Sequence, residues 1–396
     1  MADGVKRRTE HSLKPGARHG RLHSSRSRLI MAGALSLMAW ILLQWVAPPA
    51  VLPWTPAMGR AAETMAEALG ATAAHCRTLD LETDPLLDPA GTCLMGPQIT
   101  PLFTTLGQLE AKRTTLNPDL AALLVHLLRE AGVGSGDTVA VGASGSFPGL
   151  LVATLAAVEA MEAVSVPILS LGASSYGATR PEFHLLDLHV LLNRDGIINT
   201  PPMAASLGGE GDVGEGFPQT LRDSLAREIS SLGIPFLEED SLPKNVARRM
   251  EIYCRSPEVC PVAAFVNIGG ALANMGVSPG ILQVPPGLSQ DLTAQVDLPP
   301  PPRRGVLFEM AAREVPVIHL LHIRGLALKH GLPWDPLFPP KPNSTRLLRG
   351  TPSGGLPFWL LSAAYLLGLA LILISGFFPR HTVRRGPPSP SLQGKS

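Results

Sequence analysis

The pattern of apolar and polar positions predicts three parts in this chain. One apolar run covers residues 29–53, a second covers residues 356–378, and neither contains a charged residue. Each run reaches the roughly 20 apolar residues that cross the hydrocarbon core of a bilayer. We therefore predict two transmembrane helices that bracket one large domain at residues 60–350.

Within the large domain, segments with a helical period alternate with short apolar segments. Asn117 and Pro118 suit the N-cap and the first position of a helix, and glycines follow its apolar face. This alternation predicts βαβ units, and hence an α/β domain with a mostly parallel sheet and flanking helices. The predicted strands are 138–141, 165–171, 262–268 and 315–320, and further predicted helices are 147–163, 181–192, 217–232, 245–255, 306–313 and 323–330. The proline-rich residues 285–302 are expected to form an exposed excursion.

Charges outside the apolar runs predict the orientation in the membrane. The tails, residues 1–28 and 379–396, carry 12 of the 33 Lys and Arg residues but 2 of the 32 Asp and Glu residues. The positive-inside rule places both tails in the cytoplasm, so the domain lies outside. We expect a two-pass protein of the cell (inner) membrane with a periplasmic or extracellular domain. A cleaved signal peptide is the alternative for the first run, but its length and terminal prolines favour an uncleaved anchor.

All four cysteines lie in the predicted outside domain, where an oxidising environment favours disulfides. The local pairings are Cys76 with Cys93 and Cys254 with Cys260, although connectivity does not follow from sequence alone. No CxxC spacing is present, and His75 directly adjoins Cys76, which is not a ligand spacing. We therefore predict neither a metal nor a cofactor.

Without its tails the chain is acidic. The segment between the tails has a net charge of −9 with His counted as neutral, although the whole chain carries +1. Long-range electrostatics would repel a polyanion, so no nucleic-acid partner is predicted, and an anionic ligand would need a local basic or backbone-amide site.

Four glycine-rich loops follow apolar segments, at residues 142–149, 172–182, 206–216 and 267–276. The carboxyl ends of parallel strands meet at one edge of a sheet, where ligands of open α/β folds bind. We therefore expect these loops to converge on one cleft. Standard motifs do not fit them: no Lys follows the first loop as a P-loop requires, and position 146 is Ser where GxSxG needs Gly.

Two kinds of chemistry remain open for these loops. In one, Ser146 is a nucleophile, His319 its base, and Asp212 or Asp187 orients the histidine. Alternatively, Ser146 caps the helix that follows it, and His319 is a buried core residue. In the other, the loops bind carboxylates without catalysis, through backbone amides and Arg180. The candidate ligand-binding residues are Ser144, Gly145, Ser174, Ser175, Tyr176, Arg180, Gly208, Gly209, Asn267, Gly269 and Gly270.

Six sequence blocks together carry a family resemblance. They are GSFPG (145–149), GASSYGA (172–178), SLGGEGDVG (206–214), RRMEIY (248–253), NIGG (267–270) and VPVIHLL (315–321). In content and order they resemble the bacterial poly-γ-glutamate system protein family over roughly residues 110–335. Tyr176 stands where that family is expected to have Trp.

The resemblance implies a membrane-bound accessory component of poly-γ-glutamate synthesis and export, and it assigns no reaction. The expected partners are poly-γ-glutamate or a related anionic polymer, the membrane, and other subunits of the synthase or exporter. A serine-dependent hydrolase or acyltransferase that acts on γ-glutamyl amide bonds outside the membrane is the alternative function.

Overall fold

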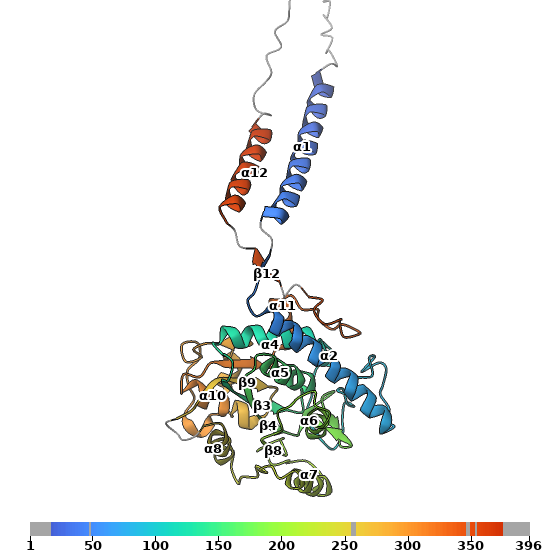
Figure 1. The fold of residues 1–396 in the computed structure, drawn as a ribbon, viewed down its shortest axis with the longest axis vertical. Helices are drawn as coiled ribbons and strands as arrows, with labels where there is room; N and C mark the ends of the chain where they lie inside the picture. Colours follow the sequence, from blue (N-terminus) through green and yellow to red (C-terminus); the bar gives the residue numbers. More distant parts are fainter. Residues whose placement is uncertain (1–16, 47–48, 255–258, 346–348, 353–354, 375–396) are drawn as a thin grey trace, which may run out of the picture. The chain divides into compact units, whose positions relative to one another are not determined.

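The structure, a computed structural model, describes residues 17–46, 49–254, 259–345, 349–352 and 355–374 (Figure 1). The chain divides into two compact units: residues 1–50 with 350–396, and residues 51–349. Strands β1 (Pro49–Val51) and β12 (Arg349–Pro352) pair with each other where the chain passes between the units.

The first unit contains two helices that are long and apolar enough to cross a membrane. They are α1 (Ala17–Val46), with its apolar stretch at Arg26–Leu43, and α12 (Leu356–Ile374). The Ser36 hydroxyl of α1 lies 3.1 Å from the Tyr365 hydroxyl of α12. Within the first predicted span, residues 29–53, the helix α1 ends at Val46 and β1 covers Pro49–Val51. Residues 375–378 of the second predicted span, and most of both tails, lie outside the described residues.

A six-stranded sheet with the order β10-β11-β9-β3-β4-β8 forms the centre of the second unit. All neighbours in it are parallel except β10 and β11, which are antiparallel. The strands are β3 (Thr138–Ser144), β4 (Val164–Ser170), β8 (Ala204–Ser206), β9 (Val262–Ile268), β10 (Gly287–Ser289) and β11 (Val317–Leu320). The predicted α/β class with a mostly parallel sheet is confirmed.

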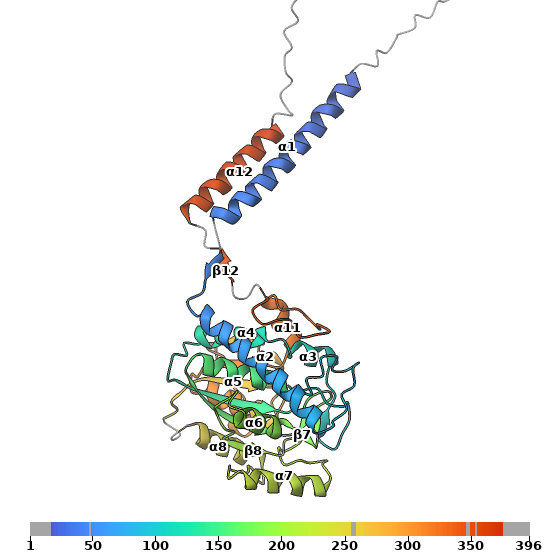
Figure 2. The ribbon, with the colours of Figure 1, turned by 45° about the vertical axis from the view of Figure 1, so that its right-hand side comes forward.

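Strand residues alternate between the two faces of this sheet, so each face has its own apolar core. Val139 and Val141 of β3 belong to one core, whereas Ala140 belongs to the other. The helices of the first face include α2 (Thr55–Thr78), α4 (Asp119–Glu130), α5 (Pro148–Ala160) and α6 (Leu185–Arg194). The second face is covered by α8 (Leu242–Tyr253) and α10 (Val306–Ala311). Figure 2 shows α2 running along α4 and α5.

The remaining elements are short or lie outside the sheet. Helices α7 (Gln219–Ser231) and α11 (Ile323–Lys329) were predicted, whereas α2 was missed although Met58, Ala61, Ala62 and Met65 repeat with a helical period. The others are β2 (Phe103–Thr105), α3 (Leu109–Thr114), β5 (Ala173–Ser174), β6 (Thr179–Arg180), β7 (Phe183–His184), α9 (Leu272–Met275) and the 3₁₀ turns Pro279–Gln283 and Pro301–Arg303.

Two segments differ from their predicted structure. The helix expected at residues 181–192 begins later, at Leu185, because β6 and β7 first form an antiparallel hairpin. The proline-rich segment 285–302 is not simply an exposed excursion. It contributes the edge strand β10 and buries Leu292 and Val296 in the second core. Apolar side chains between the prolines therefore tie this segment to the domain.

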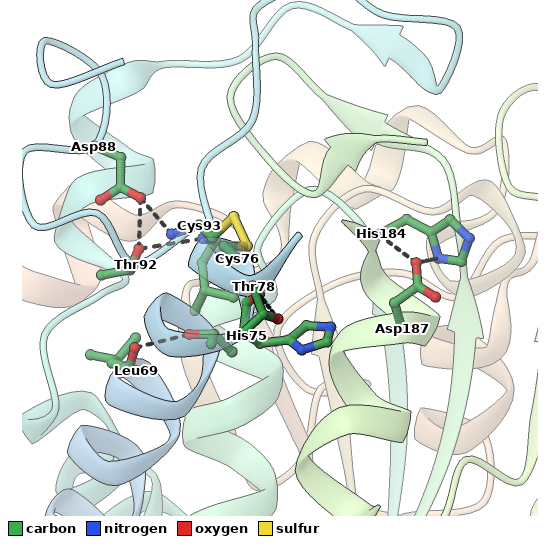
Figure 3. The surroundings of a disulfide bond; sticks show 11 residues. Leu69, His75, Cys76, Thr78, Asp88, Thr92, Cys93, His184 and Asp187 are labelled. Carbon is green, nitrogen blue, oxygen red and sulfur yellow. Dashed lines mark hydrogen bonds and ion pairs between the residues drawn. A yellow bond between two sulfur atoms is a disulfide. The ribbon is translucent and has the colours of Figure 1, made fainter. Parts of the chain in front are cut away.

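Both predicted cysteine pairs lie at disulfide distance. The Cα–Cα separation is 6.3 Å for Cys76 and Cys93 and 4.2 Å for Cys254 and Cys260. Figure 3 shows the first pair, with the buried Asp88 carboxylate accepting hydrogen bonds from the Thr92 hydroxyl and the Cys93 backbone N–H. These bonds hold Cys93, whose φ of 65° is unusual for a residue other than glycine.

Candidate functional site

A cavity of about 420 Å³ lies at the carboxyl edge of the sheet. In chain order, β4 and β8 are added to the sheet on one side of β3. The later strands β9 and β11 are added on its other side. The connections after β3 and β9 therefore diverge, which opens a crevice at this edge. Ser146 after β3 and Gly270 after β9 both line the cavity. Its volume falls within the roughly 300–1,000 Å³ of small-molecule sites.

All four glycine-rich loops contribute to this cavity, so their predicted convergence is confirmed. Of the residues named as candidates from sequence, six line it: Ser144, Ser146, Ser174, Gly208, Gly209 and Gly270. The others do not: Gly145, Ser175, Tyr176, Arg180, Asp187, Asp212, Asn267, Gly269 and His319. Arg180 lies in the β6–β7 hairpin and not directly before a helix, which removes it from the position predicted for a carboxylate ligand.

The cationic residue at the cavity is Lys112 of α3, which no sequence motif marks. Its side chain is 2% exposed, and its Nζ lies 2.7 Å from the Ser174 Oγ. The Nζ also donates to the Ser146 carbonyl oxygen and lies 3.8 Å from the centre of the Phe147 ring. Strand β2 pairs with β5, and this pairing brings the segment before α3 against the loop that carries Ser174.

Lys112 has no carboxylate partner within the part of the chain that the structure describes. Burial lowers the pKa of its amine from 10.5 to about 7, and no opposite charge offsets this effect. Glu210 is the acidic residue among those that line the cavity, and its side chain is exposed. The cavity therefore holds a buried amine whose counter-charge, when it is protonated, must come from elsewhere.

Ser146 does not cap the helix that follows it. The N-cap of α5 is Phe147, without a side-chain cap, and the Ser146 Oγ instead accepts a 3.1 Å hydrogen bond from the Ser174 backbone N–H. This bond and the two contacts of Lys112 tie the loop after β3 to the loop after β4. The capping hypothesis was wrong because the loop turns before the helix begins, which directs the hydroxyl toward the neighbouring strand.

The structure does not assemble Ser146, His319 and Asp212 into a triad. The His319 Nδ1 lies 2.9 Å from the Asn267 Nδ2, and among the described residues no hydrogen bond joins His319 to Ser146 or Asp212. Burial lowers the pKa of His319 to about 4. A histidine on a buried strand, with an amide neighbour, matches the core interpretation that the sequence left open.

Asp212 instead forms an ion pair with Arg249 beneath the cavity. The Arg249 Nη2 lies 2.7 Å from the Asp212 Oδ2 and also donates to the hydroxyls of Ser170 and Ser206. Because Asp212 neutralises Arg249, this guanidinium does not supply the cavity with free positive charge. Its bonds to Ser170 on β4, which lines the cavity, and to Ser206 on β8 hold these two strand ends in fixed positions.

Residues that line the cavity also carry backbone N–H groups that are free to donate. Within the described residues, the N–H groups of Ser146, Gly209 and Gly270 have no hydrogen-bond acceptor. Gly209 adopts a φ of 76°, a conformation that favours glycine and turns its peptide unit relative to the strand direction. Backbone N–H groups without a partner can donate charge-assisted hydrogen bonds to an anion.

A second cluster of polar residues lies outside the cavity, at the start of α6. Ligand atoms of His184, Asp187 and Glu228 lie within 4.8 Å of one another and could hold a metal ion. The two ring nitrogens of His184 face different carboxylates, at 3.2 Å from Asp187 and 3.1 Å from Glu228. A protonated His184 satisfies both carboxylates, and Figure 3 shows its contact with Asp187.

The chain was compared with protein-family models, with curated proteins and with solved structures, and none matches. The resemblance of the six sequence blocks to the poly-γ-glutamate system proteins therefore stays a prediction.

Lys112 is the main feature of the site that sequence reasoning missed. It lies in the short helix LEAKRT, among ordinary charged residues and outside every glycine-rich loop. Its burial depends on the β2–β5 pairing between segments about 70 residues apart. The one available signal was indirect: the acidic domain predicts that an anionic ligand needs a local basic group.

Proposed function

We propose that this chain is a membrane-anchored accessory component of poly-γ-glutamate biosynthesis or export, which binds the carboxylate-bearing polymer outside the membrane. The resemblance of the sequence blocks suggests the polymer, and the cavity supplies chemistry suited to it. Partner subunits of the synthase or exporter would contact the same chain through its membrane helices or its domain surface.

The observation that carries this proposal is the buried amine of Lys112 without an acidic partner. A protonated amine in an apolar, water-poor environment is unfavourable unless an anion compensates its charge. A polymer carboxylate would provide that charge, and the N–H groups of Gly209 and Gly270 would donate to its oxygens. Local contacts of this kind outweigh the −9 charge of the segment, because distant charges are screened over about 8 Å.

The membrane in which the chain lies and its orientation there are part of the same proposal. Two candidate membrane helices and two cysteine pairs at disulfide distance fit a membrane protein with an oxidised domain. We propose two passes through the cell membrane with both tails in the cytoplasm, because the tails hold the excess of basic residues. Reporter fusions at Ser391 and Asp223 should report opposite sides of the membrane. Reports from the same side would refute this orientation.

Binding is tested by removing the amine from the cavity. Full-length protein in lipid nanodiscs is titrated with fluorescent poly-γ-glutamate, and binding is followed by anisotropy. Lys112→Met keeps the aliphatic stem but removes the charge-assisted hydrogen bonds, which are worth about 1.5–3 kcal/mol. We expect at least about 10-fold weaker binding, since 1.4 kcal/mol is tenfold in affinity.

The matched control is Lys244→Met, the same substitution at an exposed lysine of α8 that pairs with Asp240. It should leave the affinity within about twofold, because exposed ion pairs contribute little. Equal losses for both variants would mean that binding follows net charge and not the cavity. Unchanged binding by Lys112→Met would overturn the proposal.

A second candidate function is the serine-dependent hydrolase or acyltransferase. One observation favours it: the 2.7 Å contact between the Lys112 Nζ and the Ser174 Oγ, two residues that both line the cavity. It requires a different pair of residues from the triad that the sequence suggested.

A further inference from the structure

We propose that Ser174 and Lys112 form a nucleophile–base pair, and that the cavity carries out acyl transfer on an amide of the bound polymer. The reaction is a further activity, and its substrate rests on the proposed function. Serine–lysine pairs are a known variant of the serine–histidine arrangement, so a histidine is not required.

The positions of the two side chains support this assignment. Ser174 lines the cavity, and its Oγ lies 2.7 Å from the Lys112 Nζ, within the hydrogen-bond reach that a general base needs. The Ser146 carbonyl oxygen accepts from the same Nζ, which directs the amine of Lys112. The Ser146 Oγ accepts from the Ser174 N–H and fixes the backbone of the nucleophile. Ser146 is thus a positioning residue.

The protonation state of Lys112 decides whether it can act as a base. Its amine must be neutral to accept a proton, and burial lowers its pKa from 10.5 to about 7. The groups that face Nζ are two serines and the Phe147 ring. The other charged groups are the exposed Glu210, which also lines the cavity, and Glu110 and Arg113 on α3. Arg113 is paired with Asp335. Among the described residues, none of these charged groups forms an ion pair with Lys112, and burial is the main cause of its lowered pKa.

The chemical steps balance with groups already present. Lys112 accepts the Oγ proton as the Ser174 oxygen bonds to the carbonyl carbon of the amide. The carbon–nitrogen bond then breaks, and the departing nitrogen takes the proton from Lys112. Water attacks the resulting ester while Lys112 accepts its proton, the bond to Oγ breaks, and Oγ recovers a proton from Lys112. Gly209 and Gly270 line the same cavity with N–H groups that have no acceptor in the described residues, so we assign them as donors to the oxyanion.

Binding and catalysis use opposite protonation states of the same lysine. A protonated Lys112 holds a carboxylate, whereas a neutral Lys112 activates Ser174. The carboxylate that hydrolysis releases forms beside Lys112. The protonated Lys112 that binds a substrate carboxylate would therefore also bind this product carboxylate. Carboxylate binding should therefore strengthen below about pH 7, and acylation should speed up above it.

The test uses full-length protein in nanodiscs and a biotinylated fluorophosphonate, a probe that does not depend on polymer recognition. Attack by the Ser174 Oγ forms an oxygen–phosphorus bond and expels fluoride, while Lys112 takes the proton. Peptide mass spectrometry should locate the adduct on Ser174. Lys112→Met should slow labelling by at least about 10²-fold, the usual contribution of a general base. The wild-type labelling rate should rise with pH around a midpoint near 7.

The matched control is Ser175→Ala, which removes the neighbouring hydroxyl from a buried side chain that does not line the cavity. It should label like the wild type, whereas Ser174→Ala should not label. Folded protein without an adduct between pH 6 and 9, an adduct only on another residue, or a rate that is flat with pH would each overturn the proposal. The wild-type pH profile keeps the test decisive if Lys112→Met fails to fold.

Failure of this inference is distinguishable from failure of the proposed function. If Ser174 does not label but Ser174→Ala and the wild type bind poly-γ-glutamate equally, the site binds without catalysis. If Ser174 labels but Lys112→Met still binds the polymer at full affinity, the catalytic pair stands and the binding proposal fails.

Discussion

Arg249 and Asp212 form an ion pair that is closed to solvent, with 2.7 Å between Nη2 and Oδ2 and side-chain exposures of 0% and 1%. The pair joins α8 to the loop after β8, across 37 residues of sequence. Asp212 has a φ of 66°, so the backbone of the glycine-rich loop bends to present its carboxylate. This pair, and not a catalytic triad, accounts for Asp212.

Replacing Asp212 by Asn should destabilise the protein strongly. The substitution keeps the shape and suits the positive φ, but it leaves Arg249 buried with an uncompensated charge. Loss of one partner of a buried pair costs about 3–5 kcal/mol. Urea unfolding of the full chain in detergent micelles measures this change. The control is Asp195→Asn, which breaks an exposed Arg194–Asp195 pair and should cost under about 1 kcal/mol. Equal effects would contradict the structural role of the buried pair.

Gly269 and Gly270 should respond differently to alanine although they are neighbours. Gly269 has a φ of 79°, and a Cβ on it would lie 2.3 Å from the Ser144 Oγ. The backbone strain alone costs about 1–3 kcal/mol. Gly270 has no positive φ, and its nearest neighbour to a Cβ is the Met275 Cε at 3.5 Å. The Gly269→Ala variant should thus have a much lower unfolding free energy than the Gly270→Ala variant.

Part of the Gly269→Ala loss should be recovered by a second substitution. Ser144→Ala removes the Oγ that meets the new Cβ, but it does not change the φ of residue 269. The double variant should therefore be more stable than the sum of the single effects predicts, in a double-mutant cycle measured by urea unfolding. Simple additivity would show that the close contact with Ser144 is not the cause.

The elements and loop positions that depend on the local sequence pattern could be predicted from the sequence. Strand β9 was predicted with its observed bounds, Val262–Ile268, and the convergence of the loops followed from the parallel order of strands. The contacts of side chains within the site were not predictable, because they depend on pairings between distant segments. Lys112 reaches Ser174 across 62 residues, and Arg249 reaches Ser170 across 79 residues. Nothing in the local sequence of either residue marks it as buried.

The cluster of His184, Asp187 and Glu228 predicts that Glu228 stabilises the protein more at acidic pH than at alkaline pH. Burial alone would lower the pKa of His184, but the hydrogen bond to Glu228 and the charges of Asp187 and Glu228 outweigh it and raise the pKa. A raised folded pKa gives stability that is complete below about pH 6.5 and is lost as the pH rises through the folded value. Glu228→Gln should hence cost about 1 kcal/mol at pH 6, a value reduced for the partial exposure of Glu228. It should cost less at pH 9.

Unfolding of this variant across pH is compared with that of Glu251→Gln, which breaks an exposed pair with Arg248 on α8. That control should show no pH dependence between pH 6 and 9, because no titrating histidine is involved. A Glu228→Gln effect that is constant with pH would contradict a protonated His184 between the two carboxylates.

The pKa of Lys112 can be measured through stability, independently of any ligand. Its folded pKa of about 7 lies below the ordinary 10.5, so between these values the unfolded chain binds a proton that the folded chain has lost. Stability rises with pH wherever the unfolded state binds more protons. The charged lysine thus destabilises the fold below pH 7, and this penalty is relieved as the pH rises toward 10.5. Each pH unit is worth about 1.4 kcal/mol per group.

We expect the unfolding free energy of the wild type to rise by about 2 kcal/mol from pH 7 to pH 9, relative to Lys112→Met. Lys112→Met lacks the titrating amine, so the difference between the two proteins isolates this group from all others. Lys244→Met is the control. Its unfolding free energy should still rise by the full amount from pH 7 to pH 9 relative to Lys112→Met, because Lys244 is exposed and its pKa is raised by Asp240. A difference that is flat across this range would place the Lys112 pKa near its ordinary value. The amine would then be charged at neutral pH and unable to act as the base for Ser174.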